Sequence, residues 1–319
     1  MIWLWIAFVA LILILLALDL GIFHRHAHVI TIREALAWAG VWVAMAMGFA
    51  VFVYFLYERR WFGIQPDVAS GGEAAILFLT GYLLEKSLSL DNVFVIALLL
   101  DYFRVPAISR HRVLFWGILG ALIMRGAMIG GGVALVSRFH WVIYVLGVFL
   151  IFSAFRLLLS RAEAHPQNNI LVRLARRLLP ISDKTDAEHF LTRVNGRWAL
   201  TPMAMALVTV EGADAAFAVD SIPAIFAITE VPFIIFTSNV FAILGLRSLY
   251  FAVAGLLGKF RYLKLSLAVL LALIGTKMLL RDVLHAVPGL TYWTLGSIVV
   301  ILGCGILASI LHPAEEKRF

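Results

Sequence analysis

Three carboxylates stand close together inside an apolar part of the chain. Residues 210–224 read VEGADAAFAVDSIPA and carry Glu211, Asp214 and Asp220, with Pro223 three residues after the last acid. A carboxylate in the middle of a lipid-facing helix costs about 2.5–3.5 kcal/mol even on the most lenient insertion scale. The acids of this segment are therefore expected to face a cavity, a charged partner or an ion.

A second acidic segment has the same layout. Residues 85–97 read EKSLSLDNVFVIA, and Glu85 and Asp91 stand at the spacing of Asp214 and Asp220, at an offset of 129 residues. In both segments an acid is followed by five residues, an Asp, and then Asn or Ser. The two segments are therefore interpreted as copies of one motif.

The oxygen atoms of these segments predict the kind of ion that they could hold. The later acid is followed by Asn92 in the first segment and by Ser221 in the second. Carboxylate, amide, hydroxyl and backbone oxygens, without sulfur or histidine, suit hard divalent cations such as Mn²⁺, Mg²⁺ or Ca²⁺. The acids that we assign to such a site are Glu85, Asp91, Glu211, Asp214 and Asp220.

A proline predicts how the acids are aimed. On an uninterrupted helix Asp214 and Asp220 lie about 240° apart around the axis, so they could not meet at one ion. Pro223 has no N–H to donate and clashes with the carbonyl of Val219 one turn back. We therefore expect a break between Val219 and Pro223 that re-aims Asp220 and frees a carbonyl as a further ligand. The first segment, SLSLDN, has no proline, so the case for a matching break there is weaker.

Internal neutralisation is the alternative to a metal site. Arg125 and Arg247 are better suited to pair with an acid or cap a carbonyl than to bind substrate, because a fixed cation repels a metal ion. The bases within apolar runs equal the acids in number, and they are Lys86, Arg125, Arg156, Arg247 and Lys277.

The composition indicates which elements position these residues. Of the 319 residues, 63% are hydrophobic and 14% are charged, which predicts an all-α, polytopic membrane protein. The single cysteine, Cys304, allows neither a disulfide nor a thiolate metal cluster within one chain. Apolar runs long enough to span a bilayer predict about nine transmembrane helices, at residues 2–21, 35–57, 74–100, 112–136, 141–160, 200–228, 232–257, 263–281 and 290–311. The first of these has no basic start and no cleavage site, so a retained helix is expected.

The distribution of Lys and Arg predicts the orientation. Most of the basic residues fall in loop 161–199, in the other loops on its side and in the carboxy-terminal tail, so the amino terminus is expected outside and the carboxy terminus in the cytoplasm. Loop 161–199 is expected to be partly helical. This pattern explains the net charge of +7 by membrane topology, and we set nucleic-acid binding aside. In the first cytoplasmic loop His24, His26 and His28 form a minor candidate metal site.

The two motifs belong to an inverted repeat. The helices that follow them also match, with Arg125 corresponding to Arg247 and Arg156 to Lys277. Helices three to five, residues 73–160, therefore resemble helices six to eight, residues 200–288, in the opposite orientation. The remaining parts are an amino-terminal hairpin, the cytoplasmic loop, and a last helix with its tail, at residues 1–72, 161–199 and 289–319. Secondary transporters are often built this way, with the ion site where two discontinuous helices meet.

The segments EKSLSLDN and VEGADAAFAVDSIPA resemble the signature segments of the TerC family of integral membrane proteins, and within it the Alx branch. The resemblance extends over nearly the whole chain. It implies a protein of the bacterial inner membrane linked to manganese efflux and, by name, to tellurium resistance. It also implies that the acids of the two motifs carry the metal.

These features favour a secondary transporter rather than an enzyme, specifically a divalent metal ion transporter that exports Mn²⁺. The ion would be held by Asp91 and Asp220 from two broken helices, assisted by Asp214, Glu211 and Glu85. No nucleotide-binding GxxxxGK[ST] motif is present, so coupling to protons is expected and no prosthetic group is needed. Two alternatives stay open: an accessory protein that delivers metal to exported proteins, and an intramembrane hydrolase, although no HExxH motif is present.

Overall fold

The computed structural model describes residues 2–21, 31–63, 68, 70–159, 189–194, 197–253, 262–284, 287 and 289–311. Within these ranges, the side chains of residues 19–21, 91, 194, 197 and 253 lie outside the description. The candidate histidines His24, His26 and His28 and most of loop 161–199 also fall outside it.

Each predicted span overlaps a long helix of the described chain. The helices are α1 (Ile2–Gly21), α2 (Ile32–Glu58), α3 (Gly71–Tyr102), α4 (Ala107–Arg138), α5 (Val142–Leu159), α7 (Pro202–Phe226), α8 (Pro232–Leu244), α9 (Leu246–Val253), α10 (Leu263–Leu279) and α12 (Leu290–Leu311), with short helical turns at η1 (Trp61–Gly63) and α11 (Arg281–Leu284). In the described residues, six helices are long and apolar enough to cross a membrane, counting Pro232–Ala252 as one. The prediction of an all-α membrane fold is confirmed, whereas the count of nine spans stays a prediction.

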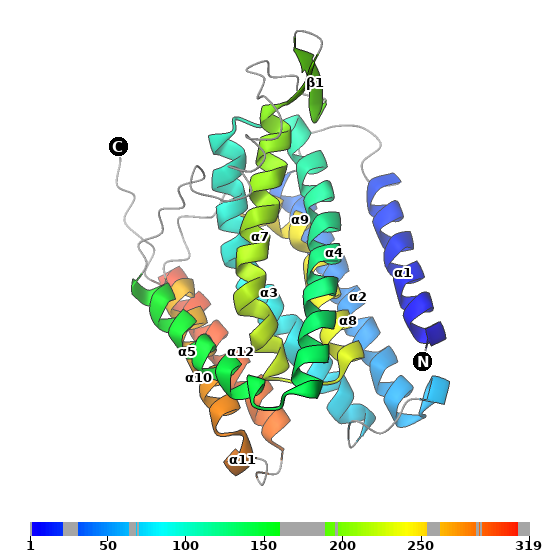
Figure 1. Ribbon diagram of the computed structural model, residues 1–319, viewed down its shortest axis with the longest axis vertical. Helices are drawn as coiled ribbons and strands as arrows, with labels where there is room; N and C mark the ends of the chain where they lie inside the picture. Colours follow the sequence, from blue (N-terminus) through cyan, green and yellow to red (C-terminus); the bar gives the residue numbers. More distant parts are fainter. Residues whose placement is uncertain are drawn as a thin grey trace.

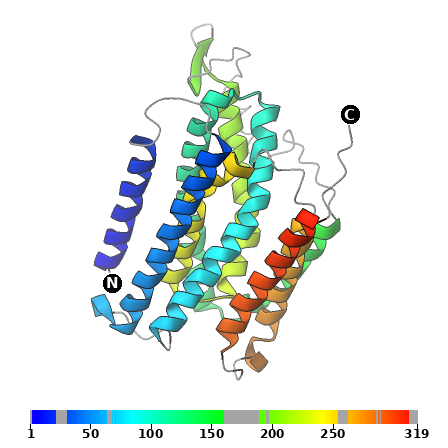
Figure 2. The same cartoon turned by 180° about the vertical axis from the view of Figure 1, so that it is seen from behind.

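The long helices run side by side (Figures 1 and 2). Helix α8 lies inside the bundle, and 89% of the most apolar window of Pro232–Ala252 is buried. Phe241 of α8 packs against Phe49 of α2 with ring centroids 4.6 Å apart, and Phe233 packs edge-on against Trp5 of α1 at 5.4 Å. The enclosed α8 therefore joins the first two helices to the rest of the bundle.

Local capping explains where several helices begin. Ser70 accepts a hydrogen bond from the backbone N–H of Glu73 at 3.1 Å, and Thr31 accepts one from Glu34 at 3.3 Å. Both starts have the Ser/Thr-x-x-Glu spacing that is typical of a helix amino terminus. Helix α7 starts in a related way, because Thr201 caps Ala204 and Pro202 occupies the first turn, where no N–H is needed.

The expected break at Pro223 is wrong. Helix α7 continues through Pro223 to Phe226, and α3 is likewise continuous through Glu85 and Asp91. Pro223 lies in the last turn of α7 and removes one backbone hydrogen bond without ending the helix. The carbonyl of Val219 still lacks the N–H one turn later, because proline has none. The helix that is interrupted is the next one, at Gly245 between α8 and α9.

The contacts between the two predicted repeats are reciprocal. Helix α3 packs against α8 as α7 packs against α4, and α5 packs against α10. The last pair meets at two glycines: a Cβ on Gly147 would lie 3.1 Å from the carbonyl oxygen of Gly275, and a Cβ on Gly275 would lie 2.8 Å from that of Gly147. The inverted repeat predicts this pattern of contacts, and the repeat itself stays a prediction.

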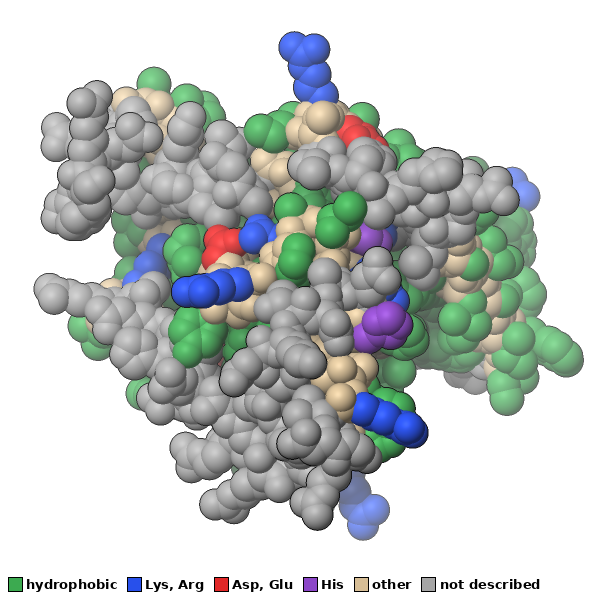
Figure 3. All heavy atoms as spheres, turned by 90° about the horizontal axis from the view of Figure 1, so that it is seen from above, with side chains coloured by type: hydrophobic (Ala, Val, Ile, Leu, Met, Phe, Trp, Pro, Cys, Tyr) green, Lys and Arg blue, Asp and Glu red, His purple; other side chains and the backbone are tan. Residues whose placement is uncertain are grey.

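The described end of loop 161–199 is a β-hairpin rather than a helix. Strands β1 (Leu191–Val194) and β2 (Arg197–Leu200) pair antiparallel, and Arg193 lies over the ring of its cross-strand partner Trp198 at 4.6 Å. The hairpin stands at the end of the molecule where α3 ends and α4 begins (Figure 1). Figure 3 looks onto this end, where Lys and Arg side chains (blue) project from the surface.

Candidate functional site

Arg125 joins two of the predicted acids in the interior. Its Nη2 and Nε donate to the two carboxylate oxygens of Asp214 at 2.8 and 3.2 Å, and its Nη1 donates to Glu85. The three side chains come from α4, α7 and α3, and Arg125, Glu85 and Asp214 are only 1%, 1% and 8% exposed. Ser221 Oγ lies at the edge of this cluster, 3.5 Å from Nη1. The structure therefore brings together Glu85 and Asp214, the two acids that occupy the same position in the two motifs.

This charge cluster (Glu85, Arg125 and Asp214) favours internal neutralisation for the acids that it contains. A buried carboxylate is tolerated when it is paired and hydrogen-bonded, and the fork of an arginine satisfies two oxygens at once. The cluster still holds two acids for one base, so it keeps a formal negative charge that can attract a cation. As ligands, Glu85 and Asp214 are occupied by Arg125 in this arrangement.

Asp220 has a different environment. Its Oδ1 accepts a hydrogen bond from Ser153 of α5 at 2.7 Å, the side chain is partly exposed, and no basic side chain of the described chain pairs with it. Because α7 is unbroken, Asp214 and Asp220 point to different neighbours. Asp220 is therefore a carboxylate within a membrane-spanning helix that a hydroxyl, rather than a base, stabilises.

The partner predicted for Asp220 falls outside the described side chains. The backbone of Asp91 lies in α3, but its carboxylate is not described. The neighbouring supporting residues Asn92 and Ser221 are both buried. In the described part of the chain no three Asp, Glu, His or Cys side chains come close enough to hold a metal ion. The pairing of Asp91 with Asp220 stays a prediction.

Glu211 of α7 lies against Gly117 and Gly120 of α4. A Cβ on Gly120 would lie 2.2–2.6 Å from the carboxylate atoms of Glu211, and one on Gly117 would lie 4.0 Å from its Oε1. The side chain of Glu211 is partly exposed, and it has no ion pair in the described chain. The missing side chain at Gly120 is what makes room for this carboxylate.

Lys86, predicted as a base that neutralises an acid, instead contacts the interruption between α8 and α9 at Gly245. Lys86 Nζ donates to the carbonyl of Ala242 at 3.2 Å, and a Cβ on Gly245 would lie 2.5 Å from the same Nζ. A cation is favourable at a helix carboxy terminus, where carbonyls lack intrahelical partners. Arg247, which the predicted repeat matches with Arg125, is buried on α9 directly after the interruption.

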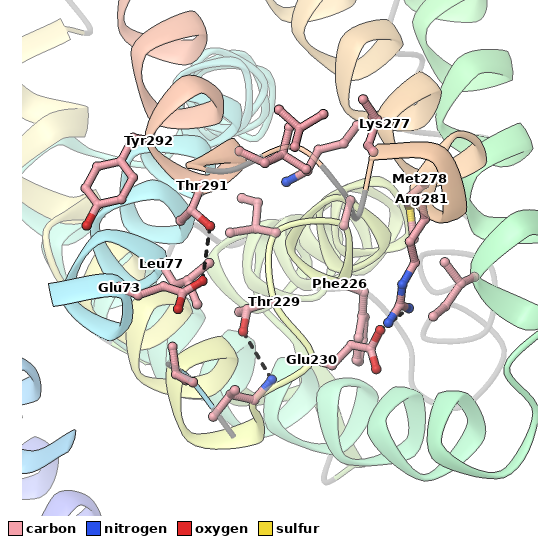
Figure 4. Close-up of a pocket in the computed structure, with 18 of the residues that line it drawn as sticks. Glu73, Leu77, Phe226, Thr229, Glu230, Lys277, Met278, Arg281, Thr291 and Tyr292 are labelled. Carbon is pink, nitrogen blue, oxygen red and sulfur yellow. Dashed lines mark hydrogen bonds and ion pairs between the residues drawn. The ribbon is translucent and has the colours of Figure 1, made fainter. Parts of the chain in front are cut away.

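A cavity of about 950 Å³, shown in Figure 4, lies beside α11, at the end of the bundle opposite the β-hairpin (Figure 1). It lies between the ends of α7 and α10 and the beginnings of α3, α8 and α12. Two polar contacts cross its walls: Arg281 pairs with Glu230, and Thr291 Oγ1 donates to Glu73 at 3.5 Å. Lys277 extends into the cavity and forms no hydrogen bond or ion pair with any described residue (Figure 4).

Two functional candidates were missed in the sequence. Ser153, the partner of Asp220, stands in an apolar run as one small hydroxyl among many, and no periodicity signals its role. The cavity was missed because its lining comes from several helices that are distant in sequence. Arg156, predicted as a neutralising base, is exposed on the outer surface of α5.

Comparison with known proteins agrees with the motifs. The sequence matches the integral membrane protein TerC family over residues 70–317. It is 48% identical over 280 residues to an uncharacterized membrane protein of Myxococcus xanthus, covering 88% of this chain and 83% of the relative. It is 44% identical over 255 residues to the "Putative membrane-bound redox modulator Alx" of Escherichia coli K12, covering 79% of this chain and 78% of that protein. No solved structure matches the chain. The protein belongs to the TerC family of integral membrane proteins.

Proposed function

We propose that this protein is a secondary transporter that exports divalent metal ions, with Mn²⁺ as its principal substrate. The observation that carries the proposal is Asp220, an acid in a membrane-spanning helix that pairs with Ser153 and with no described base. An unpaired carboxylate is expensive inside a membrane unless it faces water or an ion. Ionisable residues within membrane-spanning helices are characteristic of substrate and ion pathways.

The position of Asp220 relative to the cavity supports a route for the ion. Six residues of α7, or about 9 Å of helix rise, separate Asp220 from Phe226, which lines the cavity. The cavity lies at the end of the bundle opposite the predicted cytoplasmic loop. An ion released from Asp220 would therefore leave through this cavity to the outside of the bacterial inner membrane.

Proton coupling is the energy source that we propose. Moving a dication outward against an inside-negative potential costs about 4.6 kcal/mol per 100 mV, twice the value for one charge. Carboxylates bind either a metal ion or a proton. The same acids, Asp91, Asp220 and Glu211, would then exchange outgoing metal for incoming protons.

The printed name of the Alx relatives refers to redox modulation. This chain has one cysteine, so dithiol–disulfide exchange within a single chain is not available to it. Metal export is the function that the charged residues of the membrane helices favour.

Manganese flux in proteoliposomes tests the proposal. We expect wild type to carry Mn²⁺, and Asp91→Asn and Asp220→Asn to lose that flux while inserting normally. Asp101→Asn is the matched control, because Asp101 is an exposed acid at the end of α3 that pairs with Arg110. Equal Mn²⁺ flux in wild type, Asp91→Asn and Asp220→Asn would remove the proposed site, and absence of flux in wild type would favour the accessory role.

A further inference from the structure

Asn239 is a buried amide without a partner. Its side chain is fully buried on α8, and neither the amide oxygen nor the amide nitrogen has a hydrogen bond in the described chain. The two residues before it are satisfied, because Thr237 donates to the carbonyl of Phe233 at 2.7 Å and Ser238 donates to that of Ile235 at 3.2 Å. Buried polar groups are nearly always hydrogen-bonded, so an amide left with both atoms free calls for an explanation.

The neighbours of α8 show the direction of Asn239. Phe236 faces α4, where its ring lies 3.3 Å from the Cβ position of Gly126, and Ser238 faces α3, where its Oγ lies 2.8 Å from that of Gly81. At 100° per residue, Asn239 lies about 60° from Phe236 and about 100° from Ser238, inside the arc between them. The amide therefore lies on the face of α8 that packs against α3 and α4.

The same contacts show the depth of Asn239 in the bundle. Gly126, which meets Phe236, directly follows Arg125. On α3, both Gly81 and Lys86 contact α8, so Glu85 lies between two contacts with that helix. Asn239 thus faces the part of the bundle in which the Arg125–Glu85 pair joins α4 to α3. Tyr82 of the same stretch of α3 also has a buried hydroxyl without a partner.

We propose that Asn239 is a neutral oxygen ligand for the transported divalent cation as it passes the charge cluster. The amide oxygen is a ligand that hard divalent cations accept, and it adds coordination without further negative charge. A polar residue retained without an internal partner is understandable if the ion itself is the partner. This inference rests on the proposed function and adds a residue that neither acidic motif contains.

Replacement of Asn239 by Leu and by Ala tests the inference, because it should preserve or raise the stability of the metal-free protein while it lowers the affinity for Mn²⁺. Both variants remove an unsatisfied amide, so we expect the metal-free protein to melt at the same temperature as wild type or higher. We expect the apparent affinity for Mn²⁺ to fall at least tenfold, both when it is measured from the Mn²⁺-dependent rise in melting temperature and when it is measured from Mn²⁺ flux. Asn239→Asp keeps the ligand oxygen, replaces the amide nitrogen with a second oxygen, and is expected to retain Mn²⁺-dependent stabilisation. Ser238→Ala is the matched control, because Ser238 is equally buried and internally bonded.

The outcomes separate this inference from the proposed function. Wild-type protein without Mn²⁺ flux contradicts the proposed function itself. Wild-type flux with unchanged affinity in Asn239→Leu and Asn239→Ala leaves the transporter intact and overturns the role of Asn239. Lower melting temperatures of both metal-free variants would also overturn it, because they would mean that the amide has a structural partner.

Discussion

Replacement of Arg125 by Met should destabilise the protein strongly. The substitution leaves Glu85 and Asp214 buried without their base, at 1% and 8% exposure. Removing one partner of a buried ion pair costs about 3–5 kcal/mol, because an uncompensated charge stays in the interior. At about 2 °C per kcal/mol for a chain of this size, the melting temperature should fall by roughly 6–10 °C.

Thermal unfolding in lipid nanodiscs measures this effect, and a neutral triple variant provides the control. Glu85→Gln, Arg125→Met and Asp214→Asn together remove every charge of the cluster, so most of the stability should return. Asp220→Asn should cost only about 1 kcal/mol, because it changes a single hydrogen bond from Ser153. The loss should therefore be specific to the unbalanced cluster.

Two results would refute this reasoning. If Arg125→Met melts within a degree of wild type, the Arg125 contacts do not neutralise the two acids. If the triple variant is as unstable as Arg125→Met, the shape of the arginine rather than its charge holds α3, α4 and α7 together.

Three further changes test other parts of the structure. Gly275→Ala should cost about 1–3 kcal/mol in thermal unfolding, because the new Cβ would lie 2.8 Å from the backbone carbonyl oxygen of Gly147, whereas Gly130→Ala has open space and should not destabilise the protein; equal stability of the two variants would contradict the packing. Lys277→Gln should raise the apparent Mn²⁺ affinity measured from the cavity side about three- to tenfold, because it removes the repulsion between Lys277 and a dication about 6 Å away at the centre of the 950 Å³ cavity. Lys277→Arg keeps the charge and should behave as wild type, and an unchanged affinity in Lys277→Gln would mean that the ion bypasses the cavity. Ser153→Ala should lower stability by about 1 kcal/mol and reduce Mn²⁺ flux less than Asp220→Asn does, and greater loss of flux than in Asp220→Asn would reverse their proposed roles.

The helices and the family could be predicted from the sequence because both depend on strong local signals. Apolar runs of bilayer length mark the spans, and the repeated acidic motif identifies the family. The break at Pro223 was wrong because tertiary context can override the helix-breaking tendency of a proline. Helix α7 loses the hydrogen bond to the carbonyl of Val219 but continues to Phe226.

The partners of the acids could not be predicted because helical periodicity indicates a direction but not which helix lies there. Arg125 was expected to pair with some acid, and three-dimensional packing decides that it serves both Glu85 and Asp214. The unpartnered amide of Asn239 has no sequence signal, since polar residues of α8 differ only in what they contact.

Simultaneous measurement of Mn²⁺ and proton movement in proteoliposomes tests the central claim most directly. Wild type should move Mn²⁺ and protons in opposite directions at a fixed ratio, and Asp220→Asn should abolish both movements. Mn²⁺ flux that persists unchanged in Asp220→Asn, or that proceeds in wild type without any proton movement, would contradict metal–proton exchange at this carboxylate.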